Sequence, residues 1–321
     1  MPPPTDAFDV ADWFQRRTFD ADALDPQQLA ELKAEQGVSV SVVLPAFNEA
    51  ATIAGVIGAV MSLAGKLVDE VVVLDGGSDD DTQGLAAGHG ARVHTSVGAF
   101  PELGAALGKG DALWRSLAVT SGDIVVFIDT DIRNPDPRFV TGLIGPLLLE
   151  PGIELVKAFY ERPLEIGGTL HPTGGGRVTE LLARPLLAAF WPELSGLVQP
   201  LSGEYAGRRD LLETIPFFTG YGVEIGMLID TLLLRGADAI GQVDLKRRVH
   251  RNQDLQALSR MSFGVAQAAL RRLGAAGRGQ LDDLPTAYQQ FLRDPEGHIR
   301  MAQAQSIEIV ERPPMASQRA S

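Results

Sequence analysis

Two aspartates in the middle of the chain stand where they could hold a metal ion. Asp129 and Asp131 follow the apolar run of residues 124–128 and enter a turn flanked by proline. Carboxylates at positions i and i+2 supply the oxygen ligands that a hard divalent cation prefers, and Mg²⁺ or Mn²⁺ held there would neutralise a diphosphate. We therefore expect a metal site, although a turn with two acidic residues would use the same sequence.

Two earlier predicted strands also end in polar side chains. Residues 45–49 follow the first strand, and the acidic turn of residues 75–79 follows the second. Ligands of open α/β sheets bind outside the carboxyl ends of the strands, so three such ends on one edge would form an acidic crevice. Taken alone, Asn48 and Glu49 could be turn residues, and the acids at 79–81 could be a solvated helix N-terminus.

The charge balance excludes several classes of partner. The 321 residues include 28 Lys and Arg against 41 Asp and Glu, a formal net charge of −13. A chain this acidic has no basic surface for a nucleic-acid backbone or an anionic membrane. The absence of cysteine excludes disulfides and cysteine nucleophiles. The N-terminus lacks a signal-peptide pattern and no apolar run reaches the roughly 20 residues of a membrane span, so we expect a cytoplasmic protein.

Short Val-rich runs alternate with helical spacing from residue 38 onward. This alternation is typical of βαβ units and predicts an α/β fold with a mostly parallel sheet covered by helices on both faces. Strands are expected at residues 38–44, 70–74, 92–95, 123–128, 153–159 and 240–249. Helices are expected at residues 26–35, 50–67, 111–120, 178–190 and 221–234.

The two ends of the chain are less regular. Residues 1–37 are interpreted as an N-terminal leader, and residues 256–321 as C-terminal helices and a tail. Helical segments are expected to about residue 292, then a last strand at 306–310 and a loose tail from residue 313.

Other chemistries with similar motifs fit less well. Phosphohydrolases with an aspartyl nucleophile place Asp-x-Asp on the first strand with Thr or Val at the fifth position, whereas here the strand is late and the fifth residue is Arg133. A dehydrogenase needs Gly-x-Gly-x-x-Gly after its first strand, which residues 45–49 do not provide. The residues around Lys109 lack the upstream glycine and the Lys-Ser/Thr pair of a Walker loop.

Taken together and in order, the motifs resemble a known family. VVLPAFNE at 42–49, DGGSDD at 75–80 and DTD at 129–131 are similar to motifs of nucleotide-sugar glycosyltransferases with the GT-A fold. The resemblance narrows to the actinobacterial glucosyl-3-phosphoglycerate synthases through GKGDALW at 108–114, GGGRVTE at 174–180, PLSGEY at 200–205, YGVEIG at 221–226 and VHRN at 249–252.

The resemblance implies an activity and a ligand for each part of the chain. The implied reaction is metal-dependent transfer of glucose from UDP-glucose to 3-phosphoglycerate, with retention of the α configuration, by a homodimer. Residues 38–160 would bind the nucleotide sugar, and residues 161–255 would bind the acceptor and the donor glucose. Residues 1–37 would supply a dimer contact.

The resemblance also gives each motif a role. Asp131 and Glu224 would be the catalytic residues, and Asp131 and His250 would hold the Mg²⁺ or Mn²⁺ ion. The nucleotide sugar would contact Pro45, Ala46, Phe47, Asn48, Glu49, Gly76, Lys109, Asp129, Thr130, Tyr221, Glu224 and Arg248. The acceptor would contact Gly176, Arg177, Val178, Thr179 and Asn252. Gly76 departs from the family, whose turn carries serine there, so only its backbone could serve.

Physical chemistry supports these roles unevenly. Glycines before a helix expose backbone N–H groups and Arg177 adds a bidentate fork, which suits an anionic acceptor, although a plain capping loop is the alternative. Glu224 on an otherwise apolar helix is costly unless it is paired or functional. His250 taken alone is more often structural, so its role depends on the resemblance.

Several alternatives stay open at this point. The same fold could use a mannosyl donor or a polyprenyl phosphate acceptor, although no membrane-facing element supports the lipid. A phosphohydrolase is a further alternative, and a catalytically inactive nucleotide-sugar-binding protein is another.

Overall fold

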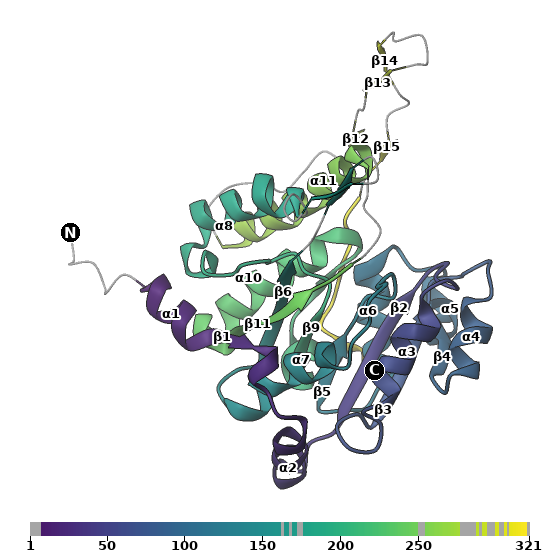
Figure 1. Ribbon diagram of the computed structural model, residues 1–321. Helices are drawn as coiled ribbons and strands as arrows, with labels where there is room; N and C mark the ends of the chain where they lie inside the picture. Colours follow the sequence, from purple (N-terminus) through teal and green to yellow (C-terminus); the bar gives the residue numbers. More distant parts are fainter. Residues whose placement is uncertain are drawn as a thin grey trace.

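An eight-stranded sheet forms the centre of the molecule (Figure 1). The computed structural model describes residues 8–161, 164–166, 169–171, 176–249, 254–276, 287–288, 291–293, 299–301, 305–306 and 308–319. In spatial order the strands are β1 (Thr18–Asp20), β11 (Ile240–Arg247), β6 (Leu155–Glu161), β9 (Tyr205–Arg208), β5 (Ile124–Phe127), β2 (Val40–Ala46), β3 (Glu70–Asp75) and β4 (Arg92–Thr95). Neighbours are parallel except at β9, which is antiparallel to β5 and β6. The predicted mostly parallel α/β fold is confirmed.

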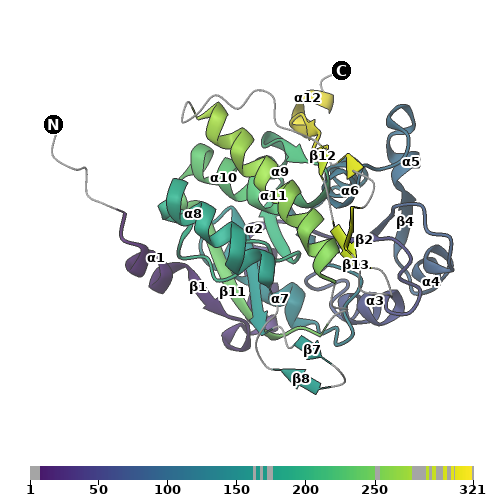
Figure 2. The same ribbon diagram turned by 90° about the horizontal axis from the view of Figure 1, so that it is seen from above.

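Helices cover both faces of this sheet (Figures 1 and 2). One face packs against α2 (Pro26–Gln36), α3 (Ile53–Met61), α4 (Thr82–Gly88) and α7 (Arg138–Leu149). The other packs against α6 (Lys109–Ser116), α8 (Arg184–Phe190), α9 (Arg209–Thr214), α10 (Val223–Arg235) and α11 (Leu255–Ala275). Successive side chains of a strand point to opposite faces, so a strand covered on both sides must be apolar throughout. The four residues of β5, all fully buried, follow this rule.

The predicted N-terminal leader is part of the sheet. Residues 10–17 form α1 (Val10–Arg17), and β1 pairs in parallel with β11 at the sheet edge. The indole N–H of the buried Trp13 donates to the carbonyl of Ala237 at 2.9 Å. The sequence analysis therefore missed α1 and β1, as it also missed α7 and β9. A dimer contact through this segment stays a prediction.

The described part of the predicted loose tail is packed against the domain. β16 (Glu311–Arg312) pairs antiparallel with β10 (Phe217–Phe218), and Nε of Arg312 donates to Oδ1 of the buried Asp111 at 2.9 Å. The indole of Trp114 donates to the carbonyl of Pro313 at 2.8 Å. The prediction of a loose tail is therefore wrong over residues 313–319, where α12 (Met315–Arg319) forms.

The other C-terminal predictions are also partly wrong. Helix α11 ends at Ala275, whereas helices were expected to about residue 292. The described residues between 277 and 293 form β12 (Ala287–Tyr288) and β13 (Phe291–Arg293) instead. The strand expected at 306–310 is replaced by β15 (Gln305–Ser306) and β16. Further short elements are α5 (Ser96–Ala99), β7 (Leu164–Ile166), β8 (Thr169–His171) and β14 (Ile299–Met301). Among the described helices, none has the length and apolar character needed to cross a membrane.

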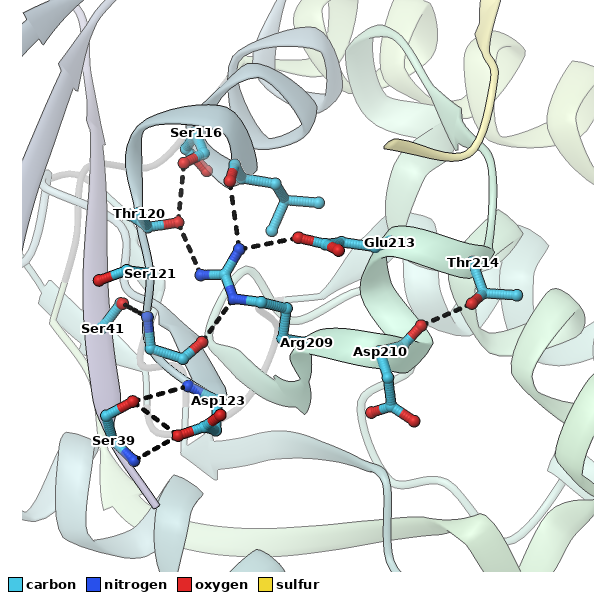
Figure 3. A network of polar contacts seen from close by, with 12 residues as sticks. Ser39, Ser41, Ser116, Thr120, Ser121, Asp123, Arg209, Asp210, Glu213 and Thr214 are labelled. Atoms are coloured by element: carbon cyan, nitrogen blue, oxygen red, sulfur yellow. Dashed lines mark hydrogen bonds and ion pairs between the residues drawn. The ribbon is translucent and has the colours of Figure 1, made fainter. Parts of the chain in front are cut away.

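Arg209, the first residue of α9, binds the segment that leads into β5 (Figure 3). Arg209 donates to the carbonyl of Gly122 at 2.6 Å, the carbonyl of Leu117 at 3.2 Å and Oγ1 of Thr120 at 3.0 Å, and it pairs with Glu213 at 3.0 Å. These bonds give partners to the carbonyls of Gly122 and Leu117, which lie outside the strands of the sheet, and they anchor the antiparallel β9 beside β5. They lie at the amino end of β5, away from its acidic carboxyl end.

The short strand β10 separates the amino ends of α6 and α10. At Gly110 an added methyl group would lie 1.9 Å from the carbonyl oxygen of Phe218 and 2.9 Å from Cβ of Val223. At Gly226 it would lie 2.5 Å from the ring of Phe218. Glycine at these positions lets both helices approach β10 closely, and this approach sets the spacing between Lys109 and Glu224.

Replacing Gly110 by alanine tests this close packing. The methyl group meets a backbone carbonyl that cannot move aside, so we expect Gly110→Ala to lose about 1–3 kcal/mol of unfolding free energy or more. Gly58→Ala is the matched control, because Gly58 lies inside α3 with nothing within 4 Å of an added methyl group. Alanine there should add about 0.5–1 kcal/mol. Urea unfolding measures both, and equal stability of the two variants would contradict the packing described.

Candidate active site

The carboxyl ends of β2, β3 and β5 border a cavity of about 600 Å³. This is the edge at which open α/β sheets bind their ligands. The predicted site residues that line the cavity are Pro45, Ala46, Phe47, Glu49, Gly76, Lys109, Asp129, Thr130, Asp131, Gly176, Arg177, Val178, Thr179, Tyr221, Glu224 and Arg248. The fold thus brings the predicted donor and acceptor segments, which lie far apart in the sequence, to one cavity.

Three predicted site residues are not placed in the lining. Asn48 has a positive φ of 57°, and its side-chain oxygen accepts from the backbone N–H of Asp79 at 2.9 Å. Its own backbone N–H donates to Oγ of Ser78 at 2.9 Å, so Asn48 joins the turns after β2 and β3. His250 and Asn252 lie outside the described residues, and their predicted roles stay predictions.

A buried carboxylate shapes the turn after β3. Asp75 is fully buried, and its Oδ2 accepts from the backbone N–H groups of Gly77 and Ser78 at 2.9 and 3.0 Å. The backbone N–H of Gly76 donates to the carbonyl of Ala46 at 2.8 Å. Asp75 therefore holds the turn, and Gly76 lies in the cavity lining, while its predicted backbone contact with the donor stays a prediction.

Charged side chains from separate elements are linked along the cavity. Lys109, the first residue of α6, places Nζ 2.6 Å from Oδ1 of Asp129 and 3.4 Å from Oε1 of Glu224, which lies in the first turn of α10. Arg248 follows β11, and its Nη2 lies 3.1 Å from Oδ2 of Asp129 and 2.7 Å from Oδ1 of Asp131. The aspartates are thereby bridged by one guanidinium, and Asp129 also has a lysine partner.

A buried glutamate that the sequence analysis missed holds Arg248 in place. Oε1 of Glu204 lies 2.9 Å from Nε of Arg248, and the hydroxyl of Tyr160 donates to Oε2 of Glu204. Glu204 is fully buried and the Arg248 side chain is 4% exposed. A buried carboxylate requires a partner of this kind. Glu204 belongs to the PLSGEY motif, so the only available signal was an acid directly before the short strand β9.

Burial and pairing together set the protonation of the site. Burial raises the pKa of Asp131 to about 6, and the neighbouring charge of Arg248 opposes the rise only in part. Burial also works against the charge of Lys109, but Asp129 and Glu224 more than offset it, so the Lys109 pKa lies well above its usual value. For Arg248 burial also acts against the charge, but Glu204, Tyr160, Asp129 and Asp131 together outweigh burial and raise the pKa. Lys109 and Arg248 are therefore permanent cations.

The other side of the cavity is formed by a loop suited to bind an anion and by an apolar wall. Gly176 has a left-handed φ of 75° and leads into Arg177, Val178 and a π-helical turn that begins at Thr179. Thr179 is buried. Helix α11 contributes an apolar wall made of Leu258, Met261 and Val265. Sequence reasoning missed this wall, because an apolar stripe on a helix looks the same whether it meets a core or a ligand.

The acidic pair fits a divalent cation in its chemistry. Asp129 and Asp131 offer hard oxygen donors at the cavity, and the Asp131 side chain is 34% exposed. Within the described ranges, no group of three or more His, Asp or Glu residues is arranged to hold a metal ion. A cation at Asp131 would therefore complete its coordination with ligand oxygens, with water or with the predicted ligand His250.

Comparison with known proteins gives a consistent result. The sequence model described as "Glycosyl transferase family 2" matches residues 41–162. A glucosyl-3-phosphoglycerate synthase of Mycobacterium tuberculosis is 52% identical over 292 residues, which cover 89% of this chain and 88% of the relative.

Two solved structures have the same fold. The crystal structure of the M. tuberculosis synthase in complex with Mn²⁺, UDP-glucose and phosphoglyceric acid has a TM-score of 0.82 and 49% identity, and covers 94% of this chain and 99% of that chain. Mannosyl-3-phosphoglycerate synthase from Rubrobacter xylanophilus has a TM-score of 0.88 and 43% identity, and covers 99% of both chains. The chain belongs to the glucosyl-3-phosphoglycerate synthase family of glycosyltransferases.

Proposed function

We propose that the protein transfers glucose from UDP-glucose to 3-phosphoglycerate with a bound Mg²⁺ or Mn²⁺ ion. The observation that supports this most directly is that one cavity contains both the Asp129 and Asp131 pair and the loop around Arg177. One side suits a metal-bound diphosphate and the other suits a small anion. The M. tuberculosis relative has been crystallised with Mn²⁺, UDP-glucose and phosphoglyceric acid, which are ligands of these two kinds.

The donor side of the cavity counters the negative charge of the chain. Asp131, together with the predicted ligand His250, would hold the cation, which when bound offsets the charge that develops on the departing diphosphate. Lys109 lies at the start of α6, where backbone N–H groups also favour an anion. Arg248 adds a second permanent cation. These residues let a protein of net charge −13 attract a nucleotide diphosphate.

Glu224 is suited to bind the donor sugar. It is 5% exposed, lines the cavity and lies 3.4 Å from Lys109. We assign it hydrogen bonds to glucose hydroxyls, and we assign attack on the anomeric carbon to the acceptor hydroxyl. Attack from the face that the diphosphate leaves gives retention, which stays a prediction here.

A different donor is the main alternative. The R. xylanophilus neighbour is a mannosyl-3-phosphoglycerate synthase and covers nearly the whole chain, so a mannosyl donor is the second candidate. Family membership speaks against the phosphohydrolase, and the described helices give no support for a polyprenyl phosphate acceptor. The homodimer and the cytoplasmic location stay predictions, and sedimentation at micromolar concentration tests the former.

A product assay with four substrate pairs distinguishes these functions. UDP-glucose and GDP-mannose are each combined with 3-phosphoglycerate or with glycerol 3-phosphate, in Mg²⁺, in Mn²⁺ and with chelator. We expect glucosyl-3-phosphoglycerate from UDP-glucose and 3-phosphoglycerate only when metal is present. Product with GDP-mannose but not with UDP-glucose would establish the mannosyl alternative. No product with either donor would contradict both proposed functions.

Asp131→Ala removes the proposed metal ligand. We expect kcat/KM for UDP-glucose to fall at least about 100-fold, because loss of even an outer-shell metal contact costs 10–100-fold. Calorimetry with Mn²⁺ and UDP should show the corresponding loss of metal affinity. Asp136→Ala is the control, since Asp136 pairs with Arg138 away from the cavity lining. Unchanged metal dependence in Asp131→Ala would show that Asp131 is not a metal ligand.

Glu224→Gln tests whether Glu224 binds sugar or forms a covalent intermediate. The amide keeps the hydrogen-bonding shape but loses the charge, so we expect activity to fall about 10- to 100-fold and remain measurable. Mass spectrometry of the wild-type enzyme with UDP-glucose provides the second readout. A glucosyl adduct trapped on Glu224 would overturn the sugar-binding role.

Arg177→Met tests the acceptor side. Loss of a charge-assisted pair with the acceptor should raise KM for 3-phosphoglycerate about 10- to 100-fold while KM for UDP-glucose stays close to the wild-type value. Arg184→Met is the matched control on the following helix, because Arg184 bonds to Glu180 and Val198 and does not line the cavity. Equal effects on both KM values in Arg177→Met would argue against an acceptor contact.

A further inference from the structure

A buried lysine lies behind the donor side of the cavity without lining it. Lys157 in β6 is 1% exposed, and its Nζ donates to the carbonyl of Ser202 at 2.6 Å and lies 4.4 Å from the ring centroid of Tyr205. Its register partners are Tyr205 in β9 and Gln242 in β11, so the three side chains share one face of the sheet. The mechanism described above makes no use of Lys157.

Residues 202–204, here called the donor floor, are held at both ends by β6. Lys157 binds the carbonyl of Ser202, and the backbone N–H of Ala158 donates to the carbonyl of Glu204 at 3.0 Å. The middle residue, Gly203, lines the cavity. Two neighbouring residues of one buried strand therefore fix the position of the floor.

The donor side chains rest directly on Gly203. A methyl group at Gly203 would lie 2.1 Å from Oδ2 of Asp129 and 2.5 Å from Nζ of Lys109. The floor lies directly against this ion pair, so a shift of the floor toward the cavity must displace Asp129, Lys109 or both. The bond between Lys157 and Ser202 is thus linked through one residue to Lys109, which would bind the diphosphate, and to its partner Asp129.

The acids of the site also influence the charge of Lys157. Burial lowers the pKa of Lys157 to about 7, against the opposing influence of the acids Glu224, Glu204 and Asp129. Burying an ammonium group is costly, and apolar residues of similar volume often stabilise such positions equally well or better. A lysine here is therefore explained poorly by fold stability and well by the carbonyl that it holds.

We propose that Lys157 is a positioning residue for the donor site. It holds the carbonyl of Ser202, which fixes Gly203, and Gly203 in turn fixes Asp129 and Lys109 at their observed separation of 2.6 Å. The kinetic consequence rests on the proposed glucosyl transfer, whereas the consequence for binding of UDP does not.

Lys157→Met in the full chain removes the donor to Ser202 and keeps the side-chain volume. We expect kcat/KM for UDP-glucose to fall about 10- to 100-fold, as for other outer-shell partners, with KM for 3-phosphoglycerate unchanged. Calorimetry should show a similar loss in UDP affinity with Mn²⁺ present. If the wild-type enzyme proves to use GDP-mannose, the same titration is made with GDP, so this binding readout stays informative when the proposed glucosyl transfer fails.

Gln242→Met is the matched control. Gln242 lies opposite Lys157 on the neighbouring strand and is equally buried, but it bonds to Val198, Gly196 and Thr18 rather than to the donor floor. It should lower the melting temperature and leave UDP affinity near the wild-type value. Equal losses of UDP affinity in the two variants, or wild-type affinity in Lys157→Met, would overturn the positioning role.

A double-mutant cycle with Gly203→Ala tests the route through the floor. Gly203→Ala displaces Asp129 or Lys109 directly, so Lys157→Met should add little further loss of UDP affinity in that background. Losses that multiply in the double variant would show that Lys157 acts independently of Gly203, and would contradict the proposal. Circular dichroism melting of each variant establishes that the compared proteins are folded.

Discussion

Two carboxylates at the end of one buried strand repel each other, and the site depends on cations that hold them together. Asp129 and Asp131 share the guanidinium of Arg248, and Asp129 also pairs with Lys109. Without these partners, the repulsion between two neighbouring carboxylates would favour protonation of one of them, and a protonated carboxyl is a poorer metal ligand. The cations come from α6 and from the chain after β11, so the fold must bring three elements to the carboxyl end of β5.

Packing far from the cavity supports this arrangement. β10 sets the spacing of α6 and α10, β16 pairs with β10, and Arg312 reaches Asp111 two residues beyond Lys109. Glu204 orients Arg248 from the donor floor. The C-terminal segment and the first turn of α6 are thus connected through buried charges, which are costly to separate. This connection explains how residues at the end of the chain support chemistry that uses residues from its middle.

Much of this could be predicted from the sequence, and the omissions have physical causes. Val-rich strands and acidic strand ends were predictable, because β2, β3 and β5 are buried on both faces and their carboxyl ends meet. The order of the sheet was not, since β9 is only four residues long and inserts antiparallel between β5 and β6. The N-terminal strand β1 has three residues, and only its pairing with β11 identifies it. Glu204 has only the weak signal of an acid before a short strand, and Lys157 has no local signal, because their importance comes from partners more than forty residues away.

The central claim is that this acidic cavity binds a nucleotide diphosphate more tightly when a cation is bound at Asp131. The most direct measurement is calorimetric titration of the wild-type protein with UDP, once with Mn²⁺ and once with chelator. Coupling between metal and UDP should tighten binding at least about tenfold, and by linkage UDP should tighten Mn²⁺ binding by the same factor. Equal UDP affinity with and without metal would contradict the account, because Lys109 and Arg248 alone would then suffice to hold the diphosphate.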